Sequence, residues 1–308
     1  MQNIYSFKTK VNFLLSLATV ATQFLDRSGL APKTLHSYEL TLIPLLHEYG
    51  QYPIETLSRS TLETYLNSLV HLAYTTHQRH QAIIQALFNF AVEQGYLSAN
   101  PIAHLRRRKP DPMKGEYASD QVVRYLSSEQ LQMLYQVIAP DVRLTALVHL
   151  LHHSGARIAE LLALNLEDVD LIHHKFQVIG KGNKQRWCFY SDDAGASLDK
   201  YLRYYRHDGC PALFTAQHPF TGLVSRLNYR TIYTYWHNCI QKEPLLQGVR
   251  IHDLRHTFAT ERVGLMGIEE LRALLGHQNI QTTLRYQKVT SERAEVVAQT
   301  AFSLLQVR

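Results

Sequence analysis

The chain has 308 residues, a length that exceeds one typical domain. Hydrophobic residues make up 45% of it and charged residues 19%, which is the composition of an ordinary soluble globular protein. Its net charge of +6 favours an anionic partner, although many basic proteins never bind nucleic acid. The three cysteines form no CxxC pair and no even-numbered set, which argues against structural disulfides and a cysteine zinc site and favours a reducing, cytoplasmic setting.

The first hundred residues are predicted to form a helical domain. Pro32 stands in a favoured first-turn position, Ser58 is a suitable N-cap, and Gly95 is a typical C-terminal breaker. Together with the apolar periodicity, these signals predict four helices, at about 11–27, 32–49, 59–72 and 76–94.

A basic connector is predicted at residues 101–124. The hundred residues before it hold six basic and six acidic side chains, whereas the connector holds six basic and three acidic ones. It contains the charge run Arg106–Lys109 and shows no apolar periodicity. Because charge runs are usually solvated, a plain hinge and a hinge that contacts DNA both remain open.

A second domain, residues 125–308, opens with a clear helix start. Ser127 and Gln130 form a capping box, and Leu126 can staple the turn. Helices are predicted at about 128–138, 141–153 and 156–163, and they return from about 193 and dominate to the end. Residues 167–190 have the strand–turn–strand pattern of a β-hairpin, with Gly and Asn at the turn. The fold class is therefore mainly α with a small β-hairpin or sheet.

Four separated segments of the second domain carry polar residues suited to chemistry. They hold Arg157 and Glu160, then Lys181, then His252 and Arg255, and finally His277 and Tyr286. Each alone has a structural explanation: Arg157 can pair with Glu160 at i+3, and Lys181 can be a solvated turn residue. Likewise, Tyr286 is one of 18 tyrosines, most of which serve packing.

Together, these segments resemble the tyrosine recombinase, or phage integrase, family, and in particular its short Xer-like members. The family pattern is an arginine in a G-x-R-x-x-E helix, a β-hairpin lysine, H-x-x-R, a G-H pair and a tyrosine about nine residues later. All six positions are filled here in that order, and Gly180-Lys181-Gly182-Asn183-Lys184 matches the turn of Xer-like members. The resemblance covers roughly residues 12–290 and is less specific in the N-terminal helices.

The resemblance implies a site-specific recombinase that cleaves and rejoins duplex DNA through a 3′-phosphotyrosyl intermediate. Arg157 and Arg255 would bind the non-bridging phosphate oxygens, because a guanidinium matches their geometry and charge. A phenol has a pKa near 10 in water, so Tyr286 needs help to deprotonate, and His252 would be its base or hydrogen-bond partner.

The remaining members of the set would have supporting roles. By resemblance, Lys181 would protonate the departing 5′ oxygen and His277 would donate to a phosphate oxygen. Glu160 would hold the Arg157 guanidinium without touching DNA. No cofactor is expected. The arginines replace a metal ion, and the phosphotyrosine bond stores the energy of the broken phosphodiester, so that ligation needs no ATP. The sequence has no P-loop, no H-E-x-x-H and no carboxylate cluster of the two-metal type.

The resemblance also implies how DNA and other protomers are held. Residues 1–100 would be the core-binding domain, which with the catalytic domain forms a C-shaped clamp around duplex DNA. The candidate contacts lie at two helix starts and in the charge run, although each could be an ordinary polar surface group. They are Lys33, Thr34, Ser37, Thr76, His77, Arg79, His80, Arg106, Arg107, Arg108 and Lys109. After Tyr286, an apolar stripe from Ala294 to Leu305 predicts a terminal helix that packs in cis or on a neighbour in a tetramer.

Two other functions remain open. A type IB topoisomerase-like enzyme would use the same chemistry without pairing two DNA sites, and the short frame with its terminal helix favours the recombinase. A DNA-binding relative without catalysis is the third reading, which the complete set of six residues argues against.

Overall fold

The structure is a computed structural model and describes residues 15–116, 123–180, 184–289 and 299. The chain divides into two compact units, Met1–Val122 and Val123–Arg308. Among the described residues, no helix combines the length and the apolar character that a membrane span requires.

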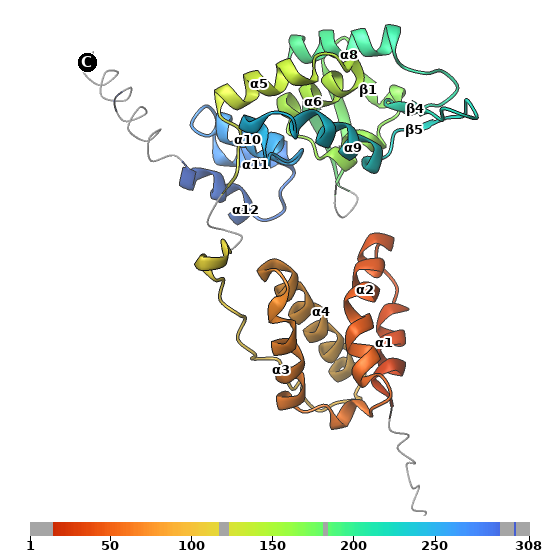
Figure 1. Ribbon diagram of the computed structural model, residues 1–308, viewed down its shortest axis with the longest axis vertical. Helices are drawn as coiled ribbons and strands as arrows, with labels where there is room; N and C mark the ends of the chain where they lie inside the picture. The colour runs from red at the N-terminus through yellow and green to blue at the C-terminus, as the bar shows by residue number, and fades with distance from the viewer. Residues whose placement is uncertain (1–14, 117–122, 181–183, 290–298, 300–308) are drawn as a thin grey trace, which may run out of the picture. The chain divides into compact units, whose positions relative to one another are not determined.

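The first unit is helical in its described part (Figure 1). Its elements are α1 (Leu17–Leu25), α2 (Pro32–Tyr49), η1 (Ile54–Thr56), α3 (Arg59–Ser68), η2 (Leu69–His71), α4 (Tyr74–Glu93) and η3 (Pro112–Lys114). The predicted cap at Ser58 is confirmed, because its side chain accepts from the Thr61 N–H. Fully buried side chains such as Phe24, Leu45 and Phe88 form the core of this unit.

The chain that follows α4 packs against the helices of the first unit, to which it belongs. Ile102 is fully buried in the helical core. The side-chain amides of Gln81 and Gln85 donate to the carbonyls of Leu105 and Ile102, each at 2.9 Å. One buried isoleucine and two amide hydrogen bonds therefore hold the start of the basic connector in place, although its sequence shows no apolar periodicity.

The second unit is built mostly of helices around the central α6 (Figure 1), which packs against both α8 and α10. Its described helices are α5 (Ser128–Ile138), α6 (Val142–Ser154), α7 (Ile158–Ala163), α8 (Asp192–Tyr204), α9 (Tyr229–Ile240), α10 (Asp253–Arg262), α11 (Ile268–Leu275) and α12 (Gln281–Leu284), with shorter turns at η4 (Leu166–Asp168), η5 (Pro244–Leu246) and η6 (Arg285–Val289). The predicted capping box of Ser127 and Gln130 is confirmed at the start of α5. The buried residues around α6 form one large core.

Two small antiparallel sheets complete the described part of this unit. The first has the order β1 (Val169–Asp170), β2 (Lys175–Ile179) and β3 (Gln185–Phe189), which confirms the predicted hairpin. The second pairs β4 (Thr215–Gln217) with β5 (Val224–Arg226). Helices dominate the described residues after 191, as predicted, but β4 and β5 were not anticipated, because strands of three residues are too short to show a recognisable alternation.

A second, smaller apolar cluster lies beside the main core. Its buried members come from α10, α11 and η6, and they are Phe258, Ala259, Leu271, Leu275 and Tyr286. The tyrosine singled out by the sequence is therefore part of a packed interior and is 3% exposed.

Candidate active site

A buried glutamate joins two arginines at the start of α7. Arg157 is the N-cap residue, and its Nη1 donates to Glu160 Oε1 at 2.7 Å. From β3, Nη2 of Arg186 donates to Glu160 Oε2 at 2.7 Å. The predicted contact between Arg157 and Glu160 is therefore present, and the carboxylate also holds a second guanidinium.

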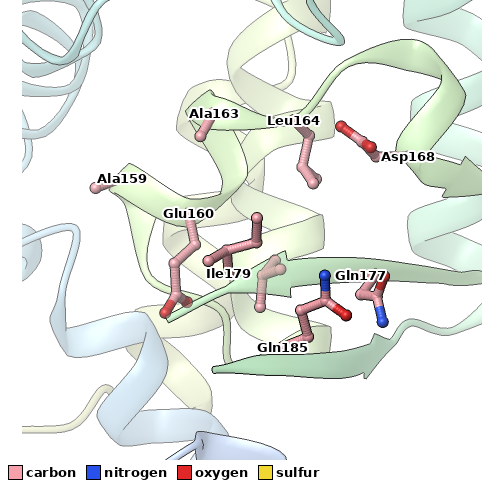
Figure 2. A pocket seen from close by; sticks show the side chains of 9 residues that line it. Ala159, Glu160, Ala163, Leu164, Asp168, Gln177, Ile179 and Gln185 are labelled. Atoms are coloured by element: carbon pink, nitrogen blue, oxygen red, sulfur yellow. The ribbon is translucent and has the colours of Figure 1, made fainter. Parts of the chain in front are cut away.

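The charge of this carboxylate is fixed by its neighbours. Burial alone would raise the pKa of Glu160, but hydrogen bonds from Arg186 and Arg157 lower it to about 2. Arg186 also donates from Nε to the carbonyl of Leu274, so one side chain links α7, β3 and α11. Figure 2 shows Glu160 reaching from α7 toward the end of the β2–β3 hairpin, at one end of a pocket of about 320 Å³.

Among the described cations of the site, Arg255 is the most deeply buried, with 2% of the residue exposed. Its guanidinium donates to the carbonyls of Gly155 and Leu275, and its Nη2 also lies 3.1 Å from Nε2 of His277. Burial and the charges of Arg157 and Arg186 lower the pKa of Arg255 to about 10, so the group stays cationic at neutral pH.

Glycines at two helix ends permit this arrangement. Gly155 ends α6 with φ +63°, and a Cβ there would lie 2.4 Å from the ring of Phe258. Gly276 ends α11 with φ +64°, and a Cβ there would lie 2.8 Å from Cδ of Arg186. Both positions thus require glycine for backbone conformation and for space.

His277 is held in one tautomer by its two partners. An arginine can only donate, so Nε2 of His277 accepts from Arg255 and the ring proton is on Nδ1. That Nδ1 lies 2.9 Å from Oγ1 of the fully buried Thr283. Burial and the charge of Arg255 lower the pKa of His277 to about 3, so the ring is neutral. In this state its Nε2 is an acceptor, and donation to a phosphate requires that Nε2 gain a proton.

Tyr286 lies beside these groups with its ring parallel to that of His277, the centroids 6.3 Å apart. Burial raises its pKa, while the charges of Arg255, Arg285 and Arg157 oppose the rise. Its hydroxyl lies 2.9 Å from Nδ1 of His256. The prediction that His252 is its hydrogen-bond partner is therefore wrong for this structure.

His252 occupies a different position, at the N-cap of α10, one turn before His256. Its side chain is exposed, and its ring centroid lies 4.7 Å from that of His256 in an edge-to-face arrangement. Desolvation by neighbouring atoms and then the charge of Arg255 lower the pKa of His252. It therefore lies at the exposed edge of the site.

The predicted turn lysine, Lys181, lies outside the described residues. The hairpin that carries it is described on both sides, with Ile179 paired to Gln185. The terminal helix predicted after residue 290 also falls outside the described part of the chain.

The predicted DNA contacts of the first unit fall into three groups. Lys33, Arg79, Arg106, Arg107 and Lys109 are exposed, and Thr34, Ser37 and Thr76 are half-buried. His77 and His80 are only 4% and 7% exposed, and His77 Nε2 bonds the Leu66 carbonyl, so both are buried in the first unit and not on its surface as predicted. Arg108 pairs with Glu116 at 2.8 Å with both side chains mostly covered, which makes it a structural ion pair.

Three residues of the site were not singled out by the sequence. Arg186 and His256 stand inside the segments that carry Lys181 and His252, but no spacing rule assigned them a role. Thr283 is a single hydroxyl in a polar stretch. Their partners are 26, 30 and 6 residues away in sequence, so only the folded geometry identifies them. In the described residues, no group of three or more His, Cys, Asp or Glu side chains is arranged to hold a metal ion.

Comparison with known proteins agrees with this geometry. The phage integrase family matches residues 124–293. The tyrosine recombinase XerC of Lactobacillus delbrueckii subsp. bulgaricus is 29% identical over 298 residues, covering 90% of this chain and 97% of the relative. The Tn1549 transposon integrase in complex with circular intermediate DNA has a TM-score of 0.69 at 20% identity, covering 88% of this chain and 95% of that one. A lambda integrase tetramer bound to a Holliday junction gives a TM-score of 0.66 at 17% identity over 86% and 78% of the two chains.

The family match spans more than half of the sequence, and the chain belongs to the phage integrase family of tyrosine recombinases. It is a site-specific DNA recombinase, an enzyme that cleaves DNA and rejoins it.

Proposed function

We propose that this recombinase acts through a covalent 3′-phosphotyrosyl bond between Tyr286 and DNA, without metal or ATP. The observation that carries the proposal is the convergence of Tyr286 with Arg157, Arg255 and His277. Two cations beside a phenol suit a reaction in which negative charge grows on a phosphodiester.

The roles follow from the chemistry of each side chain. Arg157 and Arg255 bind the non-bridging oxygens of the scissile phosphate, and His252 at the exposed edge contributes a further hydrogen bond. Lys181 protonates the departing 5′ oxygen. His277 accepts from Arg255 before DNA binds, and the negative charge of a bound phosphate favours the protonated ring that can donate. Glu160 positions Arg157.

A nicked suicide substrate tests the covalent step. Cleavage near the nick releases a short strand that diffuses away, so the phosphotyrosyl adduct accumulates and can be counted on a denaturing gel. The wild-type chain is expected to form this adduct, and Tyr286→Phe is expected to form none. An adduct that persists in Tyr286→Phe would assign the nucleophile elsewhere.

A two-site plasmid separates exchange from relaxation. Recombination between the sites produces new restriction fragments, whereas a topoisomerase-like activity only changes the linking number. We expect both, because exchange proceeds through the same cleavage. Relaxation without any exchange on cognate sites would support the topoisomerase-like alternative.

We further propose that DNA contacts both units and that the active assembly is a tetramer. The exposed basic residues Lys33, Arg79, Arg106, Arg107 and Lys109 support DNA binding by the first unit, and phosphate contacts predict a steep loss of affinity with salt. The lambda integrase tetramer on a Holliday junction supports the stoichiometry. Truncation after Lys288 tests exchange of the terminal segment: if the truncated chain still assembles tetramers with two DNA sites, the segment is not the link between protomers.

A further inference from the structure

The nucleophile proposed above has a nitrogen base already in contact with its reacting oxygen. Nδ1 of His256 lies 2.9 Å from Oη of Tyr286, and the two ring centroids are 5.7 Å apart. Within the described residues, no hydrogen bond joins Tyr286 to His252, the base expected from the sequence. A proton acceptor in direct contact lies within about 3.2 Å of the oxygen that carries the proton, and Nδ1 of His256 meets this requirement.

The surroundings of His256 keep its ring neutral. It is half-buried on α10, and the titratable and charged groups near it are His252 and Asp253 of the same helix, Arg250, Arg285 and Tyr286 of η6, and His277 after α11. Burial and then His252 lower its pKa to about 4, against a smaller opposing effect of Asp253. At pH 7 one ring nitrogen is therefore free to accept a proton.

We infer that His256 is a catalytic residue that accepts the phenolic proton of Tyr286 during DNA cleavage, and this role rests on Tyr286 being the nucleophile. With the ring proton on Nε2, Nδ1 accepts the hydrogen bond from the tyrosine. In the reaction the O–H bond of Tyr286 breaks and an N–H bond forms at Nδ1. The phenolic oxygen forms a bond to phosphorus, and the bond from phosphorus to the 5′ oxygen breaks. The 5′ oxygen leaves with a proton donated by Lys181.

Binding of DNA reduces the difference in pKa between His256 and Tyr286. The phosphate carries negative charge into the site, and this charge stabilises the protonated ring of His256. Arg255, Arg285 and Arg157 already favour the phenolate of Tyr286. Both shifts make transfer easier at the moment when the nucleophile is needed, and general base catalysis of this kind contributes about 10²–10⁴-fold in rate. On ligation the same proton returns to the tyrosine oxygen.

The test is the pH dependence of adduct formation in single turnover on the nicked substrate. His256→Asn places an amide oxygen near the position of Nδ1, which keeps a hydrogen-bond acceptor but cannot take a proton. We expect the wild-type rate to be nearly constant between about pH 6 and 8. The variant is expected to be about 100-fold slower at pH 7 and to gain about tenfold per pH unit, because hydroxide must then remove the proton.

A sulfur-containing substrate identifies which proton is involved. When a bridging sulfur replaces the 5′ oxygen, the leaving group departs without protonation. His256→Asn is expected to remain slow on this substrate, whereas a Lys181→Ala variant is expected to recover. Rescue of His256→Asn by the sulfur substrate would overturn the inference, because His256 would then act on the leaving group.

Matched variants complete the test. His173→Asn changes an exposed histidine of the same unit and is expected to leave the rate and its pH dependence unchanged. His256→Gln serves as a second variant if the Asn variant melts below the wild type or fails to shift DNA in a gel. A His256 variant that is folded, binds DNA and keeps the wild-type pH profile overturns the inference, as does one that cleaves faster. The wild-type adduct and its loss in Tyr286→Phe decide the proposed function separately.

Discussion

The two halves of the active site are held together by different forces. The arginine half is a network in which Glu160 binds two guanidiniums and Arg255 binds two helix-end carbonyls. The tyrosine half is a small apolar cluster in which Tyr286 keeps a single hydrogen bond to His256. Directional, charged contacts fix the groups that must match a phosphate, whereas apolar packing and one neutral hydrogen bond hold the group that must approach it. This contrast predicts that conservative changes are costly among the charged groups of the first half and mild among the apolar side chains that pack around Tyr286.

The largest effect is expected from Arg255→Lys. Lysine keeps the charge but cannot bond both carbonyls and a phosphate through a planar fork, so we expect adduct formation to fall about 10²–10³-fold. Single-turnover cleavage of the nicked substrate measures the loss. Arg203→Lys is the matched control, because that arginine forms an exposed i,i+4 pair with Asp199 on α8. A loss below about fivefold in Arg255→Lys would show that charge alone suffices.

Glu160→Gln should destabilise the arginine half. Removing the carboxylate leaves Arg186 and Arg157 without their shared anion, and we expect a loss of about 3 kcal/mol in the free energy of unfolding at pH 7. The pKa of Glu160 is about 2 in the folded chain, below that of an unfolded glutamate. Its stabilising effect is therefore complete above about pH 4.3 and declines as the pH falls toward 2.

Urea unfolding of Glu160→Gln and wild type at pH 7, 4 and 3 measures this difference. The gap between the two proteins should narrow as the pH falls. Glu63→Gln provides the control, because its pair with Arg59 is exposed. A gap that is independent of pH would mean that the carboxylate contributes by shape and not by charge.

An intermediate effect is expected at the boundary between the two halves. Thr283→Val removes the hydroxyl that fixes the His277 tautomer and leaves a buried Nδ1–H without an acceptor, which costs about 1–3 kcal/mol. We expect cleavage to fall about tenfold, because His277 then loses its preferred orientation toward Arg255. Thr283→Ser restores the hydroxyl and should recover most of the rate. Equal loss in the Val and Ser variants would assign the effect to packing.

The smallest effect is expected from an apolar side chain that packs in the tyrosine half. Leu271→Met conserves volume next to Tyr286, so we expect a cost below about 1.5 kcal/mol and cleavage within about threefold of wild type. Thermal melting and single-turnover cleavage provide the two readouts. A loss as large as that of Arg255→Lys would remove the distinction between the halves.

Sequence reasoning succeeded where the signal was local and failed where it was not. The helix starts at Ser58 and Ser127 and the β2–β3 hairpin follow from side chains a few residues apart. His77 and His80 show the opposite case, because a histidine side chain is suited both to a solvated helix face and to a buried one, and here both are buried. His256 shares a segment with His252, and only the return of η6 to α10 reveals which of them meets Tyr286.

The carbonyls that bind Arg255 also determine when the site comes into existence. Gly155 lies 100 residues before this arginine and Leu275 lies 20 residues after it. During synthesis, Arg157 leaves the ribosome long before the C-terminal helices that carry Arg255 and Leu275. Contacts between residues so far apart in sequence form late in folding. We therefore expect a nascent or truncated chain to bind DNA, if at all, without cutting it. The long-range anchoring of one guanidinium ties nuclease chemistry to the completion of the whole catalytic unit.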